Sequence, residues 1–596
     1  MTSERRKLFD TPGSYRLAFS GALLFYALIQ LKVAPEYLSA FRLPDIDDEM
    51  RLVMVRDLLA GQGWSDMVQY RALPPDGLPM HWSRLVDLPL AALTVLFSRF
   101  TDQMTALQIT AAIWPVALFV LYLSIIGRTM VSAIGYAQAS FSVMAAAATP
   151  SVASTFFALG RVDHHNLQIV CMTAALALIL RSGNPVRRGM AAGLISAFSL
   201  AVGLETIVFF ALLGVVLSLA YVFDRPGSVE KLGGYGFALG LFAPLFFVLQ
   251  TAPQDWTVAR CDQLSPITLA LTTLAAGFAL LLARLRHRVR SRTMRFGLVA
   301  VLGAAMFAVL WPGLAPCREG SFSTLPPEVA ETIRAGISES LSLSRMFVLS
   351  PPTAIQAVLP YLVLAGALIL YLLSGANRRR LALTLLAFVL LAVAGMFYQI
   401  RTILWGHPAL PMGFGIVMVW MLAADWKGVR WGRPLSATAV FVLVLFPSIP
   451  VWAGFETFAR GGARGDGGRA GVAPVKRSCT DPSEIARLNG LPPSGILAPL
   501  DFGTKLLLYT HHSVFALPYH RRPEAYVNGT LAFYGDEAGL AAKMDETGAD
   551  YVMVCAGMTY ASADSIGSML ARGERPDGLE RIMEAGDLTV FKRKEN

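Results

Sequence analysis

The sequence predicts a polytopic α-helical membrane protein that carries an α/β domain outside the membrane at its C-terminal end. Of the 596 residues, 55% are hydrophobic and only 15% are charged. The mean hydropathy is +0.52, and a soluble globular protein of this length does not have such a composition. The net charge of +10 comes from basic residues in short loops between apolar runs. This pattern is typical of membrane proteins and does not indicate a nucleic-acid partner.

Apolar runs long enough to cross a bilayer predict about 13 membrane spans. The first run, 15–33, follows the basic segment Glu4-Arg5-Arg6-Lys7 and lacks a small-residue cleavage site, so we expect it to be retained as a span. The apolar piece 88–97 is short, and is either interfacial or the start of an early span. The remaining predicted spans are 107–127, 129–149, 165–181, 190–204, 206–223, 232–250, 265–284, 296–312, 353–374, 380–398, 409–424 and 435–453.

The distribution of basic residues predicts the orientation of these spans. Four basic clusters fall on the same side as the N-terminus, which is therefore the cytoplasmic side; they are Arg181–Arg188, Arg284–Arg295, Arg378–Arg380 and Lys427–Arg433. A long first outer loop at about 34–105, a late outer loop at about 313–351 and the C-terminal region fall on the other side. Because the Ala/Arg/Gly-rich composition indicates a bacterial chain, we expect a multi-pass protein of the inner membrane with a periplasmic C-terminal domain.

The C-terminal region differs in composition from the rest of the chain. We expect a transmembrane domain at 1–459, a Gly/Arg-rich linker at 460–475 and a periplasmic α/β domain at 476–596. Short runs at 495–498, 505–509, 550–555 and 588–591 have the character of strands, and 535–548 has that of a helix.

Five cysteines fit an oxidising compartment on the outer side. Cys261 and Cys317 fall in outer loops, and Cys479 and Cys555 fall in the outer domain. These two same-side pairs predict two disulfides, although four unpaired thiols are the alternative. Cys171 lies inside a span, where we expect it to serve packing.

A short polar stretch, Gly160-Arg-Val-Asp-His-His165, separates two long apolar runs and is predicted to be a tight turn at the membrane boundary. Ionisable residues at this depth are costly and need a reason. In an extended turn, the side chains of Asp163 and His165 can point the same way. A carboxylate and an imidazole together suit a divalent metal such as Mn or Mg. The alternative is a hydrated turn whose polar residues cap the neighbouring helices.

The first outer loop begins with an acidic cluster, Asp45-Ile-Asp-Asp-Glu49, which precedes a helical pattern. Asp45 is either part of a site or the N-cap of that helix. We expect Asp47, Asp48 and Glu49 to form a solvated helix start, because acidic residues favour the first turn of a helix.

Together these motifs resemble the GT-C membrane glycosyltransferases, and among them the catalytic-subunit family of oligosaccharyltransferases. That family has an Asp six residues before an Arg in its first loop, and a later Gly-x-x-Asp-x-Glu/Asp motif. The corresponding stretches here are Asp45 to Arg51 and Gly160 to His165, with His165 in place of the final acid. The similarity covers most of the chain, and the family also has about 13 spans, a long first outer loop and an outer C-terminal domain.

The resemblance extends to three further places. Gly336-Ile-Ser-Glu339 looks like the family's short motif in the late outer loop, and Arg401 occupies the place of an Arg that contacts the donor pyrophosphate. Pro499-Leu-Asp-Phe-Gly503 stands where the family has Trp-Trp-Asp-Tyr-Gly. Because the paired Trp residues help to recognise the hydroxyl residue of an Asn-x-Ser/Thr acceptor, the departure argues against protein N-glycosylation but not against glycosyl transfer.

The resemblance implies an enzyme that moves a sugar or oligosaccharide from a polyprenyl phosphate or pyrophosphate to a glycan, lipid or protein acceptor. It implies Asp45 as a metal ligand and acceptor-side carboxylate, Asp163 and His165 as metal ligands, Arg401 as the phosphate-binding residue and Glu339 as an acceptor-positioning residue. No Gly-rich phosphate loop for a nucleotide-sugar stands out. Second-rank candidates are His164, Asp47, Asp48, His81, Arg84 and Asp501.

Several of these residues also have ordinary structural interpretations. Arg401 could be a boundary residue that extends its charge towards water, and Glu339 a solvated charge. His81 and Arg84 are candidates to touch donor phosphates or a headgroup, but a Trp beside an Arg is more typical of a membrane anchor. His511, His512 and His520 match no zinc spacing and are expected on surface strands.

Two other functional classes compete with the transferase. A transporter or lipid-linked-glycan flippase places polar groups near the bilayer midplane and often shows internal repeats. Here the acidic motifs lie at span ends and do not repeat, which favours chemistry at the interface. A non-catalytic assembly subunit differs from an enzyme in tolerating Asp45→Ala and Asp163→Ala.

Overall fold

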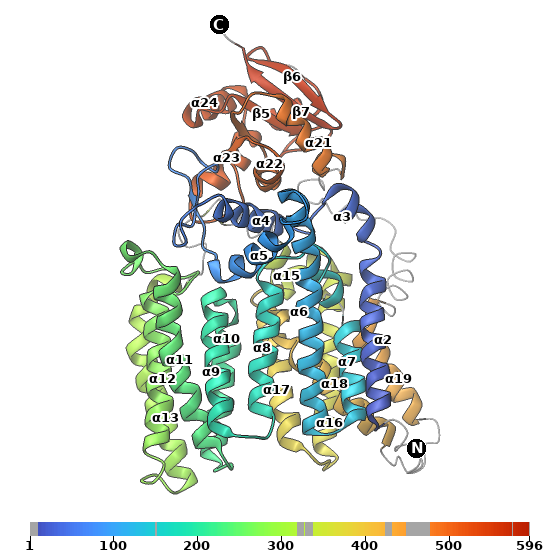
Figure 1. Ribbon diagram of the computed structural model, residues 1–596, viewed down its shortest axis with the longest axis vertical. Helices are drawn as coiled ribbons and strands as arrows, with labels where there is room; N and C mark the ends of the chain where they lie inside the picture. The colour runs from blue at the N-terminus through green and yellow to red at the C-terminus, as the bar shows by residue number, and fades with distance from the viewer. Residues whose placement is uncertain are drawn as a thin grey trace.

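The structure of the chain is a computed structural model in which residues 10–149, 152–318, 327, 330, 338–423, 432–448, 477–574 and 576–594 are described. A bundle of long helices forms one part of the molecule, and a domain with a mixed sheet sits on one end of it (Figure 1). The predicted linker 460–475, most of the late outer loop and residues 427–431 of the last basic cluster lie outside the described residues.

The bundle helices coincide with the predicted spans to within a few residues at most of their ends. They are α2 (Pro12–Gln30), α6 (Gln103–Ala133), α7 (Tyr136–Ala148), α8 (His165–Leu180), α9 (Pro185–Val202), α10 (Ile207–Val222), α11 (Ser228–Gln250), α12 (Pro266–Arg284), α13 (Arg292–Gly313), α16 (Pro351–Leu373), α17 (Arg379–Met396), α18 (Ala409–Ala423) and α19 (Gly432–Leu445).

By length and apolar composition, seven helices of the described part can cross a membrane, or up to nine when each of two bent pairs counts as one span. One pair is α2 with α3 (Ala34–Ala40), bent by 54°, and the other is the 3-10 helix η6 (Ile400–Gly406) with α18, bent by 57°. The chain is therefore a polytopic helical membrane protein, and the total of 13 crossings stays a prediction.

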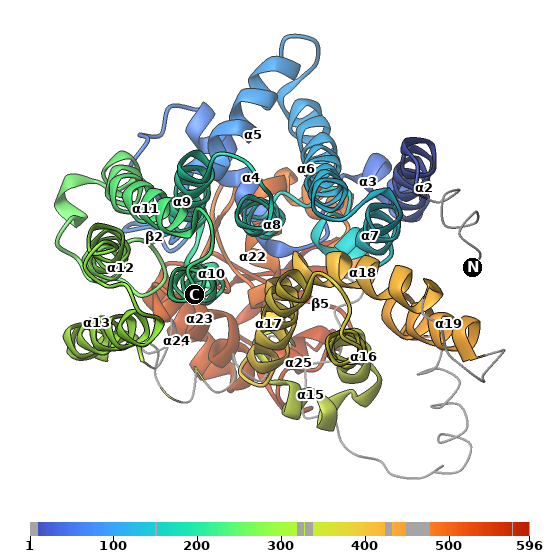
Figure 2. The ribbon, with the colours of Figure 1, turned by 90° about the horizontal axis from the view of Figure 1, so that it is seen from below.

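Two of the predicted basic loops lie at the same end of the bundle. The loops that join α8 to α9 and α12 to α13 carry basic clusters and lie at the end of the bundle opposite the C-terminal domain (Figure 1). Viewed end-on, α12 and α13 lie at the edge of the bundle (Figure 2). Only 6% of the apolar window of α13 is buried, as expected for a helix whose surface faces lipid.

Close helix packing in this part of the bundle depends on glycine. Gly189 and Gly193 are spaced four residues apart on α9, and Gly234 lies on α11. A Cβ atom at Gly189 would collide with the carbonyl of Lys231, and one at Gly193 would collide with the carbonyl of Tyr235. Small residues at this spacing let two helix backbones approach within a membrane. The contact fixes α9 against α11, and the outer ends of these helices border the site described below.

The first outer loop folds into short elements between the bundle and the C-terminal domain (Figure 1). They are α3, α4 (Ile46–Leu59), β1 (Val68–Gln69), β2 (Leu78–Pro79) and α5 (Arg84–Phe97). The apolar piece 88–97 belongs to α5, which is not among the helices long enough to cross a membrane.

A buried ion triad holds α4 against α5. Asp87 accepts from Nη1 of Arg51 at 2.8 Å and from Nη1 of Arg84 at 3.1 Å, and all three side chains are fully buried. Arg84 also donates to the carbonyl oxygens of Met54 and Asp66. The guanidinium of Arg84 is buried and makes its hydrogen bonds to residues of the same loop. The prediction that Arg84 touches donor phosphates or a headgroup is therefore wrong, and so is the membrane-anchor interpretation.

The C-terminal domain is an α/β domain, as predicted. Its sheet has the order β4-β3-β5-β7-β6, with β3 parallel to β4 and β5, and β7 antiparallel to β5 and β6. The strands are β3 (Gly495–Leu497), β4 (Ser513–Val514), β5 (Tyr551–Cys555), β6 (Leu579–Ala585) and β7 (Leu588–Arg593). The helices are α21 (Pro482–Ala486), α22 (Gly503–Tyr509), α23 (Pro523–Tyr534), α24 (Glu537–Thr547) and α25 (Ile566–Ala571).

Two sequence expectations for this domain meet different outcomes. The predicted helix at 535–548 is confirmed as α24. The predicted strand at 505–509 is wrong, because this run forms the helix α22. An apolar run of five residues does not distinguish a buried strand from a buried helix, and α22 packs against α4 of the first outer loop.

The C-terminal domain and the first outer loop are joined by buried polar contacts. Glu49 accepts from the hydroxyl of Thr504 at 2.6 Å and from the ammonium of Lys505 at 3.0 Å. Backbone hydrogen bonds of 2.8 Å join Val514 to Arg71 and to Leu73, which extends the sheet edge into the loop. The prediction of a solvated Glu49 is wrong, because the domain covers it.

Both predicted disulfides are confirmed. Cys261 is bonded to Cys317, and Cys479 to Cys555. The remaining cysteine, Cys171, is buried in α8, as expected for a packing residue.

The second of these bonds is expected to stabilise the outer domain. It closes a loop of 76 residues in sequence, so the double variant Cys479→Ser, Cys555→Ser should lose about 2–5 kcal/mol of unfolding free energy. Denaturant unfolding of the full chain, followed by near-ultraviolet circular dichroism, measures this loss. Cys171→Ala is the control that keeps both disulfides, and equal unfolding midpoints of the double variant and the wild type would contradict the expectation.

Candidate active site

The turn before α8 presents Asp163 to the acidic start of α4. Oδ1 of Asp48 accepts from the backbone N–H groups of Val162 and Asp163, at 2.8 and 2.9 Å. Gly160 has φ +88°, and a Cβ there would lie 2.7 Å from the ring of Tyr37. Only glycine fits this left-handed position, and the turn is thereby held against the first outer loop.

Two imidazoles flank the Asp163 carboxylate. Nδ1 of His165 contacts Oδ2 of Asp163, and Nδ1 of His164 lies 2.5 Å from Oδ1. The two rings stack with their centroids 4.4 Å apart, and all three side chains are buried. The expectation that Asp163 and His165 point the same way is therefore met.

Arg161 joins the turn to the first outer loop. Its Nη1 donates to Oδ2 of Asp45 at 3.0 Å and to Oδ2 of Asp48 at 3.4 Å, and its Nη2 lies 3.5 Å from Oδ2 of Asp163. Burial disfavours its charge, but the carboxylates of Asp48, Asp163 and Asp45 raise the pKa of Arg161 well above its usual value. The guanidinium therefore stays charged and holds three carboxylates around one cation.

Asp45 and Asp47 have different surroundings. Asp45 is the N-cap of α4, since its Oδ1 accepts from the backbone N–H of Asp47, and its side chain is 34% exposed. The N-cap alternative is thus confirmed, together with a pairing to Arg161. Asp47 faces inward, where the hydroxyl of Tyr519 from the C-terminal domain donates to its Oδ1 at 3.1 Å.

The acidic start of α4 is not the solvated helix turn that its sequence predicts. Asp48 is fully buried, and burial raises its pKa to about 7, with Arg161 opposing and Asp45 and Asp163 adding to the rise. Burial, and then repulsion from Asp163 and Asp45, also raises the pKa of Asp47 well above its usual value. The prediction failed because acidic residues in a first turn are common on surfaces, whereas here the turn and the outer domain cover them.

These residues fit a divalent cation. The ligand atoms of Asp163, His164 and His165 lie within 4.8 Å of one another. Nε2 of His165 is buried without a polar partner in the described part of the chain. The mutual repulsion of Asp47, Asp45 and Asp163 is relieved by a cation between them. Carboxylate oxygens with one imidazole are donors that Mn or Mg accepts.

Glu205 extends the cluster, and the sequence interpretation missed it. This residue lies on the 3-10 turn η2 (Leu204–Thr206), and its Oε1 is 3.3 Å from Nε2 of His164. Gln168 donates to its Oε2 at 3.0 Å. The available signal was the one that identified Asp163, namely an acid between two apolar runs at a span boundary.

Arg401 lies near the same cluster, on the side of Glu205. It lies on η6 and interacts electrostatically with Glu205, while Trp405 of the same turn donates from Nε1 to the Glu205 carbonyl at 2.8 Å. Arg401 is half-buried and its Nε donates to the side chain of Gln399. The Arg401 guanidinium is thus near enough to the cluster for its charge to act on Glu205.

The other predicted residues lie around this centre. Glu339 is on the 3-10 turn η5 (Ser338–Ser340), which packs against η6 through the hydrogen bond from Ile400 N–H to the Leu341 carbonyl. Asp501 is exposed on the outer domain. Ile337, which belongs to the Glu339 motif, lies outside the described residues. The roles expected for Glu339 and Asp501 stay predictions.

None of the three outer-domain histidines lies in a strand, since β4 begins after them or ends before them. His512 is fully buried, with Nε2 2.9 Å from the Leu488 carbonyl. His520 contacts Asp262 in the loop between α11 and α12. The strand prediction is therefore wrong for all three, and only the expected surface position of His511 is confirmed, because this residue is exposed. His81 lies close to His520, with ring centroids 4.7 Å apart.

Comparison with known proteins identifies the fold. No family model matches the chain, and no curated protein matches it in sequence. Among solved structures it resembles the oligosaccharyltransferase of Archaeoglobus fulgidus tethered with an acceptor peptide containing the NVT sequon, with a TM-score of 0.66 and 12% identity over 92% of this chain and 70% of the other. The archaeal oligosaccharyltransferase AglB from Archaeoglobus fulgidus, in complex with an inhibitory peptide and a dolichol-phosphate, matches with a TM-score of 0.63 and 12% identity over 91% of this chain and 69% of the other.

A third structure, the complex of the same archaeal protein with Zn and sulfate, gives a TM-score of 0.61 and 13% identity over 90% of this chain and 68% of the other. At such identities the likeness shows a shared fold. The chain therefore has the fold of a membrane oligosaccharyltransferase, and the resemblance inferred from the sequence motifs is confirmed at that level.

Proposed function

We propose that this protein is an integral-membrane glycosyltransferase that moves a sugar or oligosaccharide from a polyprenyl phosphate or pyrophosphate to a periplasmic acceptor. One observation carries the proposal: where the bundle meets the outer domain, His164 lies 2.5 Å from Asp163 and 3.3 Å from Glu205, and the charges of Asp47 and Arg401 act on these two carboxylates. The shared fold supports it, because AglB was solved with a dolichol-phosphate and the Archaeoglobus fulgidus oligosaccharyltransferase was solved with a tethered acceptor peptide.

Arg401 is the residue proposed to bind the donor phosphate. As a glycosidic bond to a phosphate breaks, negative charge grows on the departing phosphate oxygens. A guanidinium offers them two parallel N–H donors in a fixed plane. Glu205 keeps Arg401 at the cluster, because it attracts the guanidinium and its carbonyl is tied to Trp405 of the same turn.

Asp163 and His165, with Asp47 from the first outer loop, are proposed to hold a divalent metal. When bound, the metal supplies charge stabilisation to the donor phosphate. Asp45 is the less suitable first-loop ligand, because its oxygens cap α4 and pair with Arg161. Asp48 is a positioning residue, since its oxygens are used by the backbone of the Asp163 turn and by Arg161.

The acceptor is proposed to enter from the side of the first outer loop and the C-terminal domain. Asp47 and Asp45 lie on that side, and an acceptor hydroxyl or amide placed there meets a carboxylate that can take a hydrogen bond. Pro499 and Leu500 replace the paired Trp of the family motif and have no polar side-chain groups. A glycan or lipid acceptor is therefore favoured over an Asn-x-Ser/Thr peptide.

A transporter or flippase is the second candidate function. Such proteins bind their substrate near the bilayer midplane on broken helices. The helix break between η6 and α18 is one such feature. The carboxylates, however, gather at the ends of the spans, under the outer domain, and this location favours transfer chemistry.

Arg401→Ala is expected to lower glycan product in cells at least about 100-fold, because one preorganised donor to a developing oxyanion contributes that much. Arg401→Lys should restore only part of it, since an ammonium cannot form the two-pronged contact. Mass spectrometry of surface glycans and lipid extracts measures both. Arg345→Ala, an exposed arginine on the nearby helix α15 (Leu343–Leu349), is the matched control. Full activity of Arg401→Ala would contradict the proposal that Arg401 binds the donor phosphate.

A further inference from the structure

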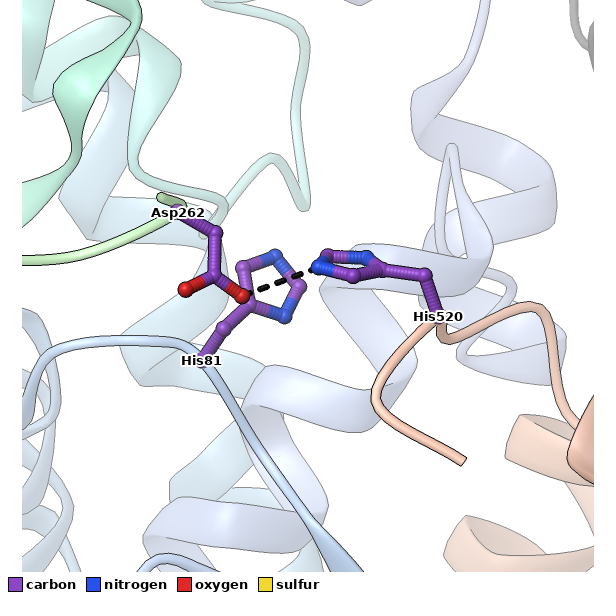
Figure 3. Close-up of side chains that lie close together, drawn as sticks. All are labelled: His81, Asp262 and His520. Atoms are coloured by element: carbon purple, nitrogen blue, oxygen red, sulfur yellow. Dashed lines mark hydrogen bonds and ion pairs between the residues drawn. The ribbon is translucent and has the colours of Figure 1, made fainter. Parts of the chain in front are cut away.

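A second group of metal-ligating side chains lies beside the candidate active site. His81 comes from the first outer loop just before α5, Asp262 from the loop between α11 and α12, and His520 from the C-terminal domain just before α23. Figure 3 shows the three side chains converging from these three segments. One ligand atom of each lies within 4.8 Å of those of the other two.

The contacts within this group leave one imidazole in need of a partner. Nε2 of His520 lies 2.9 Å from Oδ2 of Asp262. The centroids of the His81 and His520 rings lie 4.7 Å apart, and the ring planes are tilted by 53° to each other. Nδ1 of His81 is buried and has no hydrogen-bond partner among the described residues. A buried nitrogen without a partner calls for a water or an ion, and the imidazole and carboxylate groups beside it are of the types that bind Zn²⁺.

The protonation states suit metal ligation. Burial, and then the neighbouring His520, hold the pKa of His81 well below its usual value, so its ring is neutral and offers a lone pair. Burial opposes the charge of Asp262, but the hydrogen bond from His520 and the Arg521 charge keep the pKa of Asp262 below its usual value. A neutral imidazole and an ionised carboxylate are the forms that bind metal.

Arg521 orients the carboxylate without using all of its acceptor capacity. Its Nη2 donates to Oδ1 of Asp262 at 2.9 Å, its Nε to Oδ2 at 3.0 Å, and its Nη1 to the Met80 carbonyl. Each carboxylate oxygen has two lone pairs, so a cation can replace the hydrogen that lies between Oδ2 and His520. Ligating carboxylates are commonly held by such an outer hydrogen bond.

The surroundings provide rigidity and access. Cys261, next to Asp262 in the sequence, is bonded to Cys317 in the 3-10 turn η4 (Ala315–Cys317) that follows α13, and this bond restrains the loop. His81 and Arg521 line a cavity of about 290 Å³ that is also bordered by Gln250 and Arg260. Water from this cavity can occupy a fourth coordination position.

We propose that His81, Asp262 and His520 form a second metal site, for Zn²⁺, that ties the first outer loop and the α11–α12 loop to the C-terminal domain. Two imidazole nitrogens and one carboxylate oxygen are a ligand set that Zn²⁺ accepts in tetrahedral geometry with one water. The site is separate from the Asp163 cluster in its residues, and its existence does not depend on glycosyl transfer. Its role is to fasten the outer domain over the bundle.

Zinc binding to the purified full chain in nanodiscs tests the proposal. The parent for this test is the double variant Asp163→Asn, His165→Gln, which lacks two of the candidate active-site ligands. We expect this parent to bind one Zn²⁺ per chain tightly, as measured by competition with a chromophoric chelator. His520→Ala or His81→Gln added to this parent should weaken Zn²⁺ binding at least about 10-fold, because replacing even a residue that only hydrogen-bonds to a ligand lowers metal affinity by that factor. His511→Ala, which removes an exposed histidine of the same domain, should leave the affinity unchanged.

Two further measurements keep the test decisive. Zn²⁺ should raise the thermal unfolding midpoint of the parent but not of its His520→Ala variant, and Co²⁺ should give visible d–d bands that His81→Gln abolishes. If the parent does not fold, the same zinc count on the wild type should fall by one on adding His520→Ala. A count and affinity that are equal with and without His520 would overturn the proposal. Loss of zinc together with full glycan product would leave the proposed transferase intact.

Discussion

The Asp163→Asn variant is expected to lose glycan product at least about 100-fold, because stabilisation of the charge on the leaving group supplies much of the catalysis in such a site. The Asp163 carboxylate contacts Arg161, His164 and His165 at once. Asparagine keeps the shape but loses the charge that is proposed to bind a divalent ion and that pairs with both imidazoles. Mass spectrometry of cell-surface glycans, scaled to the amount of protein in the membrane, measures the loss.

Two controls separate this effect from misfolding. Asp76→Asn removes an exposed carboxylate of the first outer loop and should leave the glycan level unchanged. The elution profile and thermal unfolding midpoint of Asp163→Asn should stay close to those of the wild type, because the backbone of the turn is held by Asp48. Normal glycan levels with Asp163→Asn would show that the turn is structural.

The Asp87→Ala variant is expected to lower the free energy of unfolding by about 3–5 kcal/mol, because it leaves two buried guanidinium groups without their anion. Asp87, Arg51 and Arg84 are fully buried, so water cannot replace the lost partner. Chemical unfolding of the detergent-solubilised full chain, followed by tryptophan fluorescence, measures the change.

A surface ion pair provides the comparison. Glu230→Ala breaks the contact with Arg286, in which both side chains are 39% exposed, and should cost at most about 1 kcal/mol. The triple variant Arg51→Met, Asp87→Leu, Arg84→Met should recover most of the stability lost by Asp87→Ala. An unfolding midpoint of Asp87→Ala equal to that of Glu230→Ala would contradict a buried triad.

Helix positions were predictable because each span is encoded locally. Runs such as 232–250 and 265–284 are apolar over a bilayer thickness, and α11 and α12 begin and end within a few residues of them. The two disulfides were predictable as well, since sorting the loops by charge placed each cysteine pair on one side.

Burial of polar residues in the outer part was not predictable, because it depends on contacts distant in sequence. Glu49 is covered by Thr504 and Lys505, about 455 positions along the chain. Asp262 and His520 meet across 258 residues. No periodicity in the first outer loop indicates such neighbours, so Asp48, Glu49 and Arg84 were assigned to solvent or membrane.

Glu205 and Arg401 show the same limit within the candidate site. Arg401 was found through the family resemblance, whereas Glu205 carries no motif and became a candidate only when the turn η2 was seen next to His164. The local signal was present in both cases, as a single charge between apolar runs, but one sequence does not reveal which boundary charges converge.

Transfer in detergent tests the central claim most directly, because a micelle has no two sides and a flippase has no product there. Isotope-labelled polyprenyl-linked sugars from cells that lack the protein would be mixed with a detergent extract of the same cells and with purified wild-type or Asp163→Asn chain. We expect wild-type protein to move label from the lipid phosphate fraction to a glycan or lipid acceptor, and Asp163→Asn to leave it in place. Label that remains on the polyprenyl lipid with the wild type would contradict the transferase account.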